Sequence, residues 1–321
     1  MTINRTELLA HTATVRTQKI LAVQPIVVET DVRLLPLEVK VTAPTDGDGL
    51  PVIVFSHGYE WSMDAYEPLA QHWADAGFIV VQPTHLDSRR YGIALDDPAF
   101  PNIWRTRISD LHAVIDSLAD IINQVPTLAG RADTDQLAVV GHSWGAQTAG
   151  AILGARVLDA TGRADEDFTH PAVRAGALLS ATGAGDDLTP FALRYLPFAR
   201  PEFGTMTVPT LVIAGGRDQS EMSTRGPDWF EDAYHLAPSS KRLLVIDQAE
   251  HLLGGIAGED VKETTDEDPA RVALVADAVL SHLQKTLGIV ETAWHDFARR
   301  AAHSNDAVRI ETKSSTAQIL S

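Results

Sequence analysis

The chain has 321 residues, of which 45% are hydrophobic and 21% are charged, a balance typical of a protein that folds around a large core. Its formal net charge of −17 argues against a nucleic-acid binder, because phosphate binding draws on clustered Lys and Arg. The chain contains no cysteine, which excludes disulfides, thiolate metal sites and a cysteine nucleophile.

The N-terminal segment, residues 1–20, mixes charged and polar residues and lacks the continuous apolar run of a signal peptide. No apolar run further along the chain approaches the ~20 residues that span a bilayer. We therefore expect a protein without a membrane span, located in the cytoplasm.

Short runs rich in β-branched residues recur along the chain. Because most of them are continuous rather than alternating, they predict strands that are covered on both faces. In chain order they are Ile26–Val28, Leu37–Val41, Val52–Phe55, Phe78–Val81, Leu137–Val140, Ala177–Leu179, Leu211–Ala214 and Leu243–Ile246.

Helical patterns lie between these runs. Apolar residues at spacings of three and four predict helices over Ile108–Ile122 and Val272–Leu283, the second of which ends near Gly288. Alternating strands and helices predict an α/β fold with a mostly parallel central sheet of about eight strands and helices on both faces.

The domain prediction is a single domain over residues 1–321. Two irregular segments, 83–107 and 183–208, are too long for simple connections. They are candidates for a lid or a pocket wall, and ordinary packing on the core is an equal alternative. Residues 288–321 are predicted as one further helix and a polar tail.

The motif that carries chemistry is Gly-His-Ser-Trp-Gly at residues 141–145, which follows a predicted strand and precedes a helix. So tight a turn strains the serine backbone and requires small residues two positions before and after it, where Gly141 and Gly145 stand. The turn projects the Ser143 hydroxyl at a helix N-terminus, whose free N–H groups and dipole favour an oxyanion. Ser143 is therefore the candidate nucleophile.

A serine needs a general base to act as a nucleophile near neutral pH. His251 is the candidate because it follows the predicted strand Leu243–Ile246, at the sheet edge where Ser143 is expected. His235 is the nearest alternative, but it lies in a helix-like stretch before that strand.

The base in turn needs an acid that orients it. Asp218 is the candidate because it follows the predicted strand Leu211–Ala214, and we expect Gly215 and Gly216 to let the backbone turn its carboxylate inward. The order Ser143, Asp218, His251 is the one expected for a sheet with this serine turn. The alternatives for the acid are Asp186, Asp187 and Asp247.

The oxyanion of an acyl-transfer reaction requires a pair of N–H donors. The backbone N–H groups of Trp144 and Tyr59 are the candidates, because Trp144 follows the nucleophile and Tyr59 follows the strand Val52–Phe55. Trp61 and Trp104 are predicted to line an apolar substrate wall, with core packing as the alternative.

We predict non-catalytic roles for three other histidines. His57 and His142 are expected to be hydrogen-bonded loop residues. His85 and Asp87 could form a metal pair but lack a third ligand nearby, so we expect them in a pocket wall and expect no metal site.

Three stretches resemble the α/β-hydrolase superfamily, in the group that holds platelet-activating-factor acetylhydrolases, chlorophyllases and dienelactone-hydrolase-like proteins. They are Val54–Gly58, Gly77–His85 and Gly141–Gly145, within a resemblance that covers residues 52–287. The resemblance implies hydrolysis of carboxylic esters by a Ser–His–Asp triad without a cofactor. Dienelactone hydrolases use a cysteine nucleophile, which this chain lacks, and Ala146 stands where many relatives have a second glycine.

The sequence therefore predicts a serine hydrolase that cleaves an apolar small-molecule ester through an acyl-enzyme, with no cofactor and no nucleic-acid partner. Acyl transfer to another acceptor, and hydrolysis of an amide, a lactone or a C–C bond, are alternatives on the same triad. A non-catalytic binding protein of the same fold is a further alternative.

Overall fold

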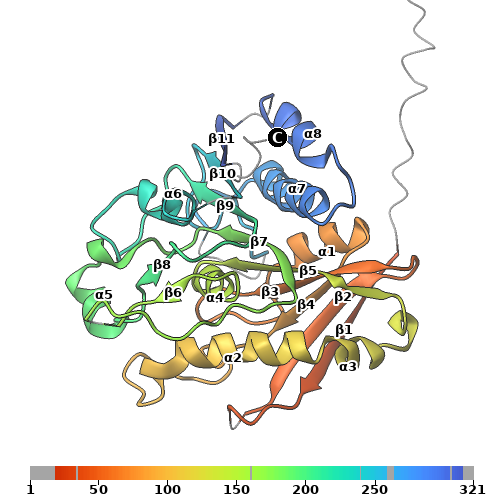
Figure 1. Ribbon diagram of the computed structural model, residues 1–321, viewed down its shortest axis with the longest axis horizontal. Helices are drawn as coiled ribbons and strands as arrows, with labels where there is room; N and C mark the ends of the chain where they lie inside the picture. The colour runs from red at the N-terminus through yellow and green to blue at the C-terminus, as the bar shows by residue number, and fades with distance from the viewer. Residues whose placement is uncertain are drawn as a thin grey trace, which may run out of the picture.

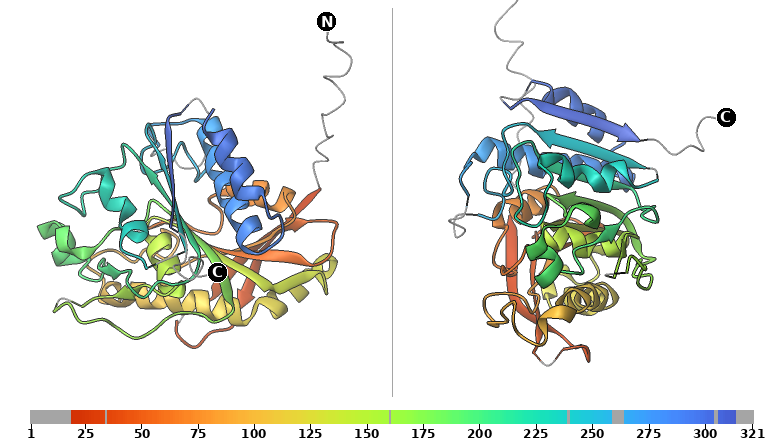
Figure 2. Two further views of the ribbon diagram at one scale, coloured as in Figure 1. Left: turned by 45° about the horizontal axis from the view of Figure 1, so that its top comes forward. Right: turned by 90° about the vertical axis from the view of Figure 1, so that its left-hand side faces the viewer.

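The computed structural model describes residues 19–33, 35–159, 161–238, 240–258, 264–303 and 306–313. Its centre is a nine-stranded sheet in the order β1-β2-β4-β3-β5-β7-β9-β10-β11 (Figures 1 and 2). The strands of this sheet are β1 Ile20–Val28, β2 Leu37–Pro44, β3 Leu50–Ser56, β4 Ile79–Pro83, β5 Ala132–His142, β7 Val173–Leu179, β9 Thr210–Gly215, β10 Lys241–Ile246 and β11 Val308–Lys313. Two short strands, β6 Arg156–Val157 and β8 Pro201–Glu202, pair separately.

The strands from β4 through β3, β5, β7 and β9 to β10 run parallel to one another. Antiparallel pairs close both sides of this block, β1 and β2 at one end and β11 at the other. Parallel strands bring their carboxyl ends to one edge of the sheet. The loops that follow β3, β5, β9 and β10 therefore meet at that edge.

Helices cover both faces of the sheet (Figure 1). One face packs against α2, α3 and α4, and the other packs against α1, α7 and α8. The helix bounds are α1 Glu67–Asp75, α2 Ile103–Asp116, α3 Leu118–Asn123, α4 Trp144–Ile152, α5 Pro190–Tyr195, α6 Asp232–His235, α7 Pro269–Thr286 and α8 Ala293–Ala301.

The two-sided covering explains the continuous apolar runs of the central strands. In β3, Val52 and Val54 belong to one core, whereas Ile53 and Phe55 belong to the core on the opposite face. All four side chains are buried. The predicted α/β fold, with a largely parallel sheet between helices, is confirmed.

Two element predictions need correction. The sheet has nine strands because residues 308–313, predicted as part of a polar tail, form β11 on the edge beside β10. The predicted helix over residues 108–122 is interrupted at Ser117, whose φ of −100° and ψ of 9° separate α2 from α3. The helix expected after Gly288 is α8, and residues 314–321 of the predicted tail lie outside the described residues.

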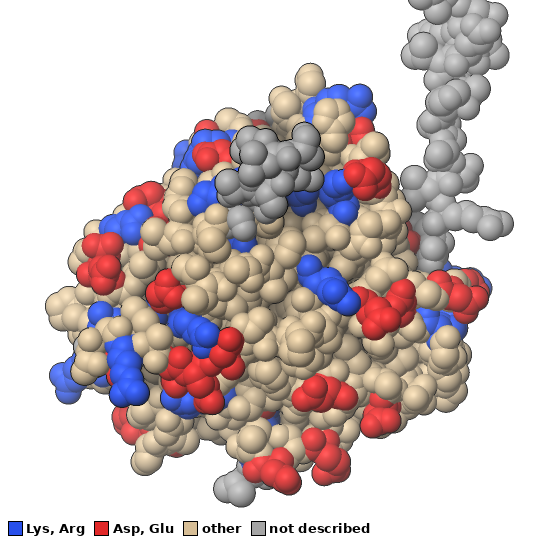
Figure 3. All heavy atoms as spheres, in the orientation of Figure 1, with Lys and Arg blue, Asp and Glu red and all other residues tan. Residues whose placement is uncertain are grey.

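The two irregular segments contain short elements. Segment 83–107 holds a 3-10 turn at Phe100–Asn102 and the first residues of α2, and segment 183–208 holds α5 and β8. Within the described residues, no helix combines the length and the apolar character needed to cross a membrane. On the face drawn in Figure 3, acidic and basic side chains lie intermixed.

The turn between β5 and α4 has little space. Ser143 adopts a φ of 56°, which is rare for a residue other than glycine. A Cβ atom at Gly141 would lie 2.1 Å from the carbonyl oxygen of Gly145, and a Cβ atom at Gly145 would lie 2.0 Å from that of Ser56. Both glycines are therefore required by the close approach of backbone to backbone.

Replacing Gly145 by Ala should lower the free energy of unfolding by about 3 kcal/mol, because the added methyl group would collide with backbone that cannot move away. Gly150 lies in the same helix, where an added Cβ would meet only side chains, at 3.8 and 3.9 Å. Gly150→Ala should therefore raise the free energy of unfolding by about 0.5–1 kcal/mol. Urea unfolding measures both variants, and equal stability of the two would contradict this description of the turn.

Candidate active site

Three side chains meet at the carboxyl edge of the parallel strands. Ser143 Oγ lies 2.9 Å from His251 Nε2, and His251 Nδ1 lies 3.0 Å from each carboxylate oxygen of Asp218. The Asp218 side chain is fully buried, whereas the His251 side chain is 38% exposed. A hydroxyl, an imidazole and a carboxylate thus lie in the sequence of contacts that activates a serine nucleophile.

The loops that carry the acid and the histidine pass directly against each other. A Cβ atom at Gly215 would lie 2.4 Å from the Ala249 carbonyl oxygen, and one at Gly216 would lie 2.7 Å from Asp247 Cα. The Arg217 N–H also donates to the Ala249 carbonyl at 2.9 Å. The two glycines therefore serve close packing of the loops, rather than the turning of the backbone that the sequence suggested.

The alternative base and acids lie elsewhere. His235 Nε2 is 3.1 Å from the Glu231 carboxylate, and Asp187 pairs with Arg225 at 3.4 Å. Asp186 and Asp247 are exposed. Asp218 is the carboxylate that contacts His251 in the described part of the chain.

A cavity of about 300 Å³ opens beside the serine, and its lining residues are Gly58, Tyr59, Trp61, His142, Ser143, His251 and Leu252. Trp61 lines this cavity, and its role in a substrate wall stays a prediction. The rings of Tyr59 and Trp144 meet edge to face, with centroids 5.0 Å apart. Within the described part of the chain, neither the Tyr59 N–H nor the Trp144 N–H donates to a protein acceptor.

Trp104, predicted for the substrate wall, does not line this cavity. It borders a separate cavity of about 10 Å³ together with Trp144 and Phe198. Its ring stacks on Phe198 with centroids 6.3 Å apart and an interplanar angle of 21°. Trp104 lies in the first turn of α2, where it is half-buried and packs against the core, which agrees with the alternative interpretation of this residue.

A group of buried polar side chains supports the loop that carries Tyr59. Arg107 donates to both carboxylate oxygens of Asp87, at 2.6 and 2.7 Å, and to the His57 carbonyl oxygen. His85 Nε2 lies 2.9 Å from Ser56 Oγ. His85 and Asp87 are 0% and 1% exposed, so they lie beneath the loop and not in the pocket wall where we expected them.

The group continues to Asp110, whose carboxylate lies 2.9 Å from His85 Nδ1 and 3.0 Å from Arg33 Nη1. Burial raises the pKa of Asp110 to about 7, against the opposing effect of Arg33. Burial also lowers the pKa of His57 to about 4, with Arg107 adding to the shift. His57 is hydrogen-bonded as predicted, because Nδ1 donates to the Gly58 carbonyl at 2.6 Å and Nε2 accepts from the His85 N–H at 2.9 Å.

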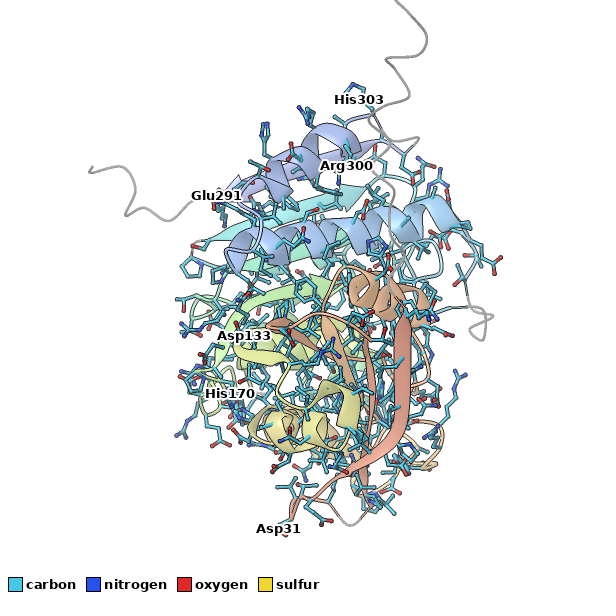
Figure 4. The ribbon with its side chains drawn as sticks, turned by 90° about the vertical axis from the view of Figure 1, so that its right-hand side faces the viewer. Asp31, Asp133, His170, Glu291, Arg300 and His303 are labelled. Atoms are coloured by element: carbon cyan, nitrogen blue, oxygen red, sulfur yellow. The ribbon has the colours of Figure 1, made fainter. Side chains whose placement is uncertain are left out.

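One further cluster has the composition of a metal site. His112, Asp116 and His170 offer ligand atoms within 4.8 Å of one another, and Figure 4 labels His170 near α2. The Ala172 N–H donates to His170 Nδ1, so Nε2 carries the proton and donates to Asp116 at 3.1 Å. His112 Nε2 donates to the Phe168 carbonyl at 3.0 Å. Three of the four imidazole nitrogens thus already have a hydrogen-bond partner, and the cluster lies outside the cavity that contains Ser143.

Three features together define an α/β-hydrolase fold. They are the order of the strands in the sheet, the strained serine between β5 and α4, and the contact between the loops that follow β5, β9 and β10. A family model of the chlorophyllases matches residues 11–216. Chlorophyllase-1 of Arabidopsis thaliana is 24% identical to the chain over 202 residues, which make up 63% of this chain and 54% of that protein. The chain therefore belongs to the chlorophyllase family.

The chain matches about half the length of the curated relative. The family match includes Ser143 but ends before Asp218 and His251. The assignment of these two residues therefore rests on their distances to each other and to Ser143.

Replacing Arg107 by Met should lower the free energy of unfolding by about 3–5 kcal/mol, because it leaves the buried Asp87 carboxylate without its cation. Arg299→Met is the matched control. The Arg299 side chain is 70% exposed beside Asp296, so its loss should cost less than about 1 kcal/mol. Urea unfolding near neutral pH measures both values, and a similar small loss for Arg107→Met would contradict the supporting role of the buried group.

Proposed function

We propose that the chain is a serine carboxylesterase in which Ser143 is the nucleophile, His251 the general base and Asp218 the acid that orients the base. The observation that carries the proposal is the continuous set of contacts from Ser143 Oγ through both imidazole nitrogens of His251 to the Asp218 carboxylate. The family assignment supports the ester as the bond that is cleaved.

In the first half-reaction, Ser143 Oγ attacks the ester carbonyl carbon while His251 Nε2 takes the hydroxyl proton. The carbonyl π electrons move to the oxygen, and the N–H groups of Trp144 and Tyr59 donate to the resulting oxyanion. When the carbonyl re-forms, the bond to the alcohol oxygen breaks and the His251 imidazolium protonates that oxygen. The acyl group is then bound to Ser143.

In the second half-reaction, His251 removes a proton from water as the water oxygen attacks the acyl-enzyme. Collapse of the second tetrahedral intermediate returns the proton to Ser143 Oγ and releases the acid. Asp218 accepts a hydrogen bond from His251 Nδ1–H throughout, which leaves the Nε2 lone pair facing the serine and stabilises the imidazolium.

The substrate that fits this site is an uncharged, apolar ester. Tyr59, Trp61 and Leu252 give the cavity apolar walls, and the net charge of −17 disfavours an anionic substrate. The aromatic side chains around Trp144 pack closely, and the cavity that they border has a volume of about 10 Å³. We therefore place the ester in the open cavity of about 300 Å³ beside Ser143.

Turnover of a panel of uncharged esters, including chlorophyll as the substrate named by the curated relative, tests the proposal. Ser143→Ala should lower kcat by about 10⁴–10⁶-fold, because it removes the nucleophile of the proposed mechanism. Ser117→Ala, between α2 and α3, is the control that should retain the rate. Turnover by Ser143→Ala within tenfold of the natural chain would contradict the assignment.

The same assay tests the acid. Asp218→Asn should lower kcat by about 10⁴-fold because an amide favours the wrong imidazole tautomer. Asp187→Asn should leave the rate unchanged, because Asp187 pairs with Arg225 and not with the base. The reverse result would move the acid to the loop after β7. Product analysis with an added alcohol separates hydrolysis from acyl transfer.

A further inference from the structure

A buried polar bridge joins the two loops on either side of the proposed nucleophile. The Gly58 N–H donates to Tyr66 Oη at 3.0 Å, and Tyr66 Oη lies 2.9 Å from His142 Nδ1. His142 Nε2 lies 2.8 Å from the carbonyl oxygen of His251. The bridge therefore runs from the loop of the proposed oxyanion donor to the loop of the proposed base.

A single protonation pattern satisfies every group in this bridge. The His251 carbonyl oxygen can only accept, so His142 Nε2 must carry a proton and Nδ1 must be the acceptor. Nδ1 then accepts the Tyr66 hydroxyl proton, which leaves the Tyr66 oxygen free to accept from Gly58. Burial, assisted by the charge of His251, lowers the pKa of His142 to about 3, which keeps the ring in this neutral form.

The bridge is shielded from water and lies against the nucleophile. Tyr66 and His142 are each 1% exposed, and Trp61 stacks on His142 at 5.9 Å with an interplanar angle of 12°. A Cβ atom at Gly58 would lie 3.1 Å from Tyr66 Oη, 3.4 Å from His142 Nδ1 and 3.6 Å from Ser143 Cβ. The hydroxyl, the imidazole and the nucleophile thus converge on one point of the oxyanion loop.

Tyr66 is itself held in an unfavourable backbone conformation. Its φ of 65° is left-handed, and its N–H donates to the Ala257 carbonyl at 2.9 Å. Ala257 belongs to the same loop as His251, so Tyr66 contacts that loop both directly and through His142. Such strain persists only where the surrounding contacts enforce it, and it is concentrated at functional sites.

We propose that Tyr66 and His142 are positioning residues for the ester hydrolysis proposed above, on which this inference rests. Together they fix the oxyanion donor near Tyr59 relative to the imidazole of His251. Stabilisation of a transition state depends on such distances to within about 0.5 Å, whereas binding to an apolar wall does not. Loss of the bridge should therefore lower kcat and change KM little.

The sharpest test is Tyr66→Phe, which removes one oxygen atom and keeps the ring. With 4-nitrophenyl acetate as substrate, kcat should fall about 10–100-fold while KM stays within about threefold. Tyr234→Phe is the matched control, because Tyr234 is also buried but packs beside β11, and it should keep the natural kcat. An unchanged kcat in Tyr66→Phe, with Ser143→Ala inactive, would overturn the bridge and leave the proposed function standing.

Variants of His142 give a second readout that does not depend on Tyr66→Phe folding. Gln can keep the donor to the His251 carbonyl, whereas Ala removes both contacts, so His142→Gln should be at least about tenfold faster than His142→Ala. Tyr66→Phe combined with His142→Ala should be no slower than His142→Ala alone within about twofold, because both substitutions break one bridge. Equal rates for His142→Gln and His142→Ala would overturn the proposal. So would a double variant whose loss of rate is the product of the losses in Tyr66→Phe and His142→Ala. Thermal unfolding of each variant identifies a loss that is only structural.

Discussion

The backbone of Ser143, held at a φ of 56°, is the constraint on which the site depends. A strained residue of this kind costs of order 1–3 kcal/mol, so its surroundings must enforce it. Gly141 and Gly145 allow β5, α4 and the end of β3 to approach at backbone distance, and the Ser143 N–H donates to the Leu179 carbonyl of β7 at 2.9 Å. The central sheet therefore fixes the direction in which the hydroxyl points.

Two different supports hold the loop opposite this serine. Beneath the loop, Arg107 and Asp87 form a buried ion pair that is joined to His57 and Ser56 by hydrogen bonds. At its side, the Tyr66–His142 bridge links the loop to the backbone of His251. Burial lowers the pKa of both His57 and His142, so the two histidines act as neutral hydrogen-bonding groups and add no positive charge beside the base. Of the two imidazoles that line the cavity beside Ser143, that of His142 is 1% exposed and that of His251 is 38% exposed, so His251 is the one accessible to a substrate in the proposed mechanism.

Much of this arrangement follows from local patterns in the sequence. Strands covered on both faces give continuous apolar runs, and the chain order of Ser143, Asp218 and His251 after three such strands is sufficient to bring them to one edge. β11 was not predicted because it is a half-exposed edge strand. Its sequence, Val-Arg-Ile-Glu-Thr-Lys, therefore resembles that of a polar tail. That residues 1–321 form a single domain, and that segments 83–107 and 183–208 act as lids, stay predictions.

Other features depend on contacts that no local pattern encodes. The sequence does not distinguish an aromatic residue of a cavity wall from one that packs on the core. Trp61 and Trp104 therefore received the same prediction, although they border different cavities. His85 and Asp87 follow a strand end, as site residues do. They nevertheless lie beneath the loop that carries Tyr59, where they bind Asp110 and Arg107 of α2. Tyr66 lies in a turn before α1 without any motif, and its role emerges only from its contacts with Gly58 and His142.

The most direct test of the account is covalent labelling of the folded chain with a fluorophosphonate, followed by mass spectrometry of its peptides. Because the reagent reacts with a serine activated by a neighbouring imidazole, the account predicts a phosphonyl adduct on the peptide that contains Ser143, and its loss in His251→Ala. An adduct on another residue, or a folded chain that shows no adduct at all, would contradict Ser143 as the nucleophile.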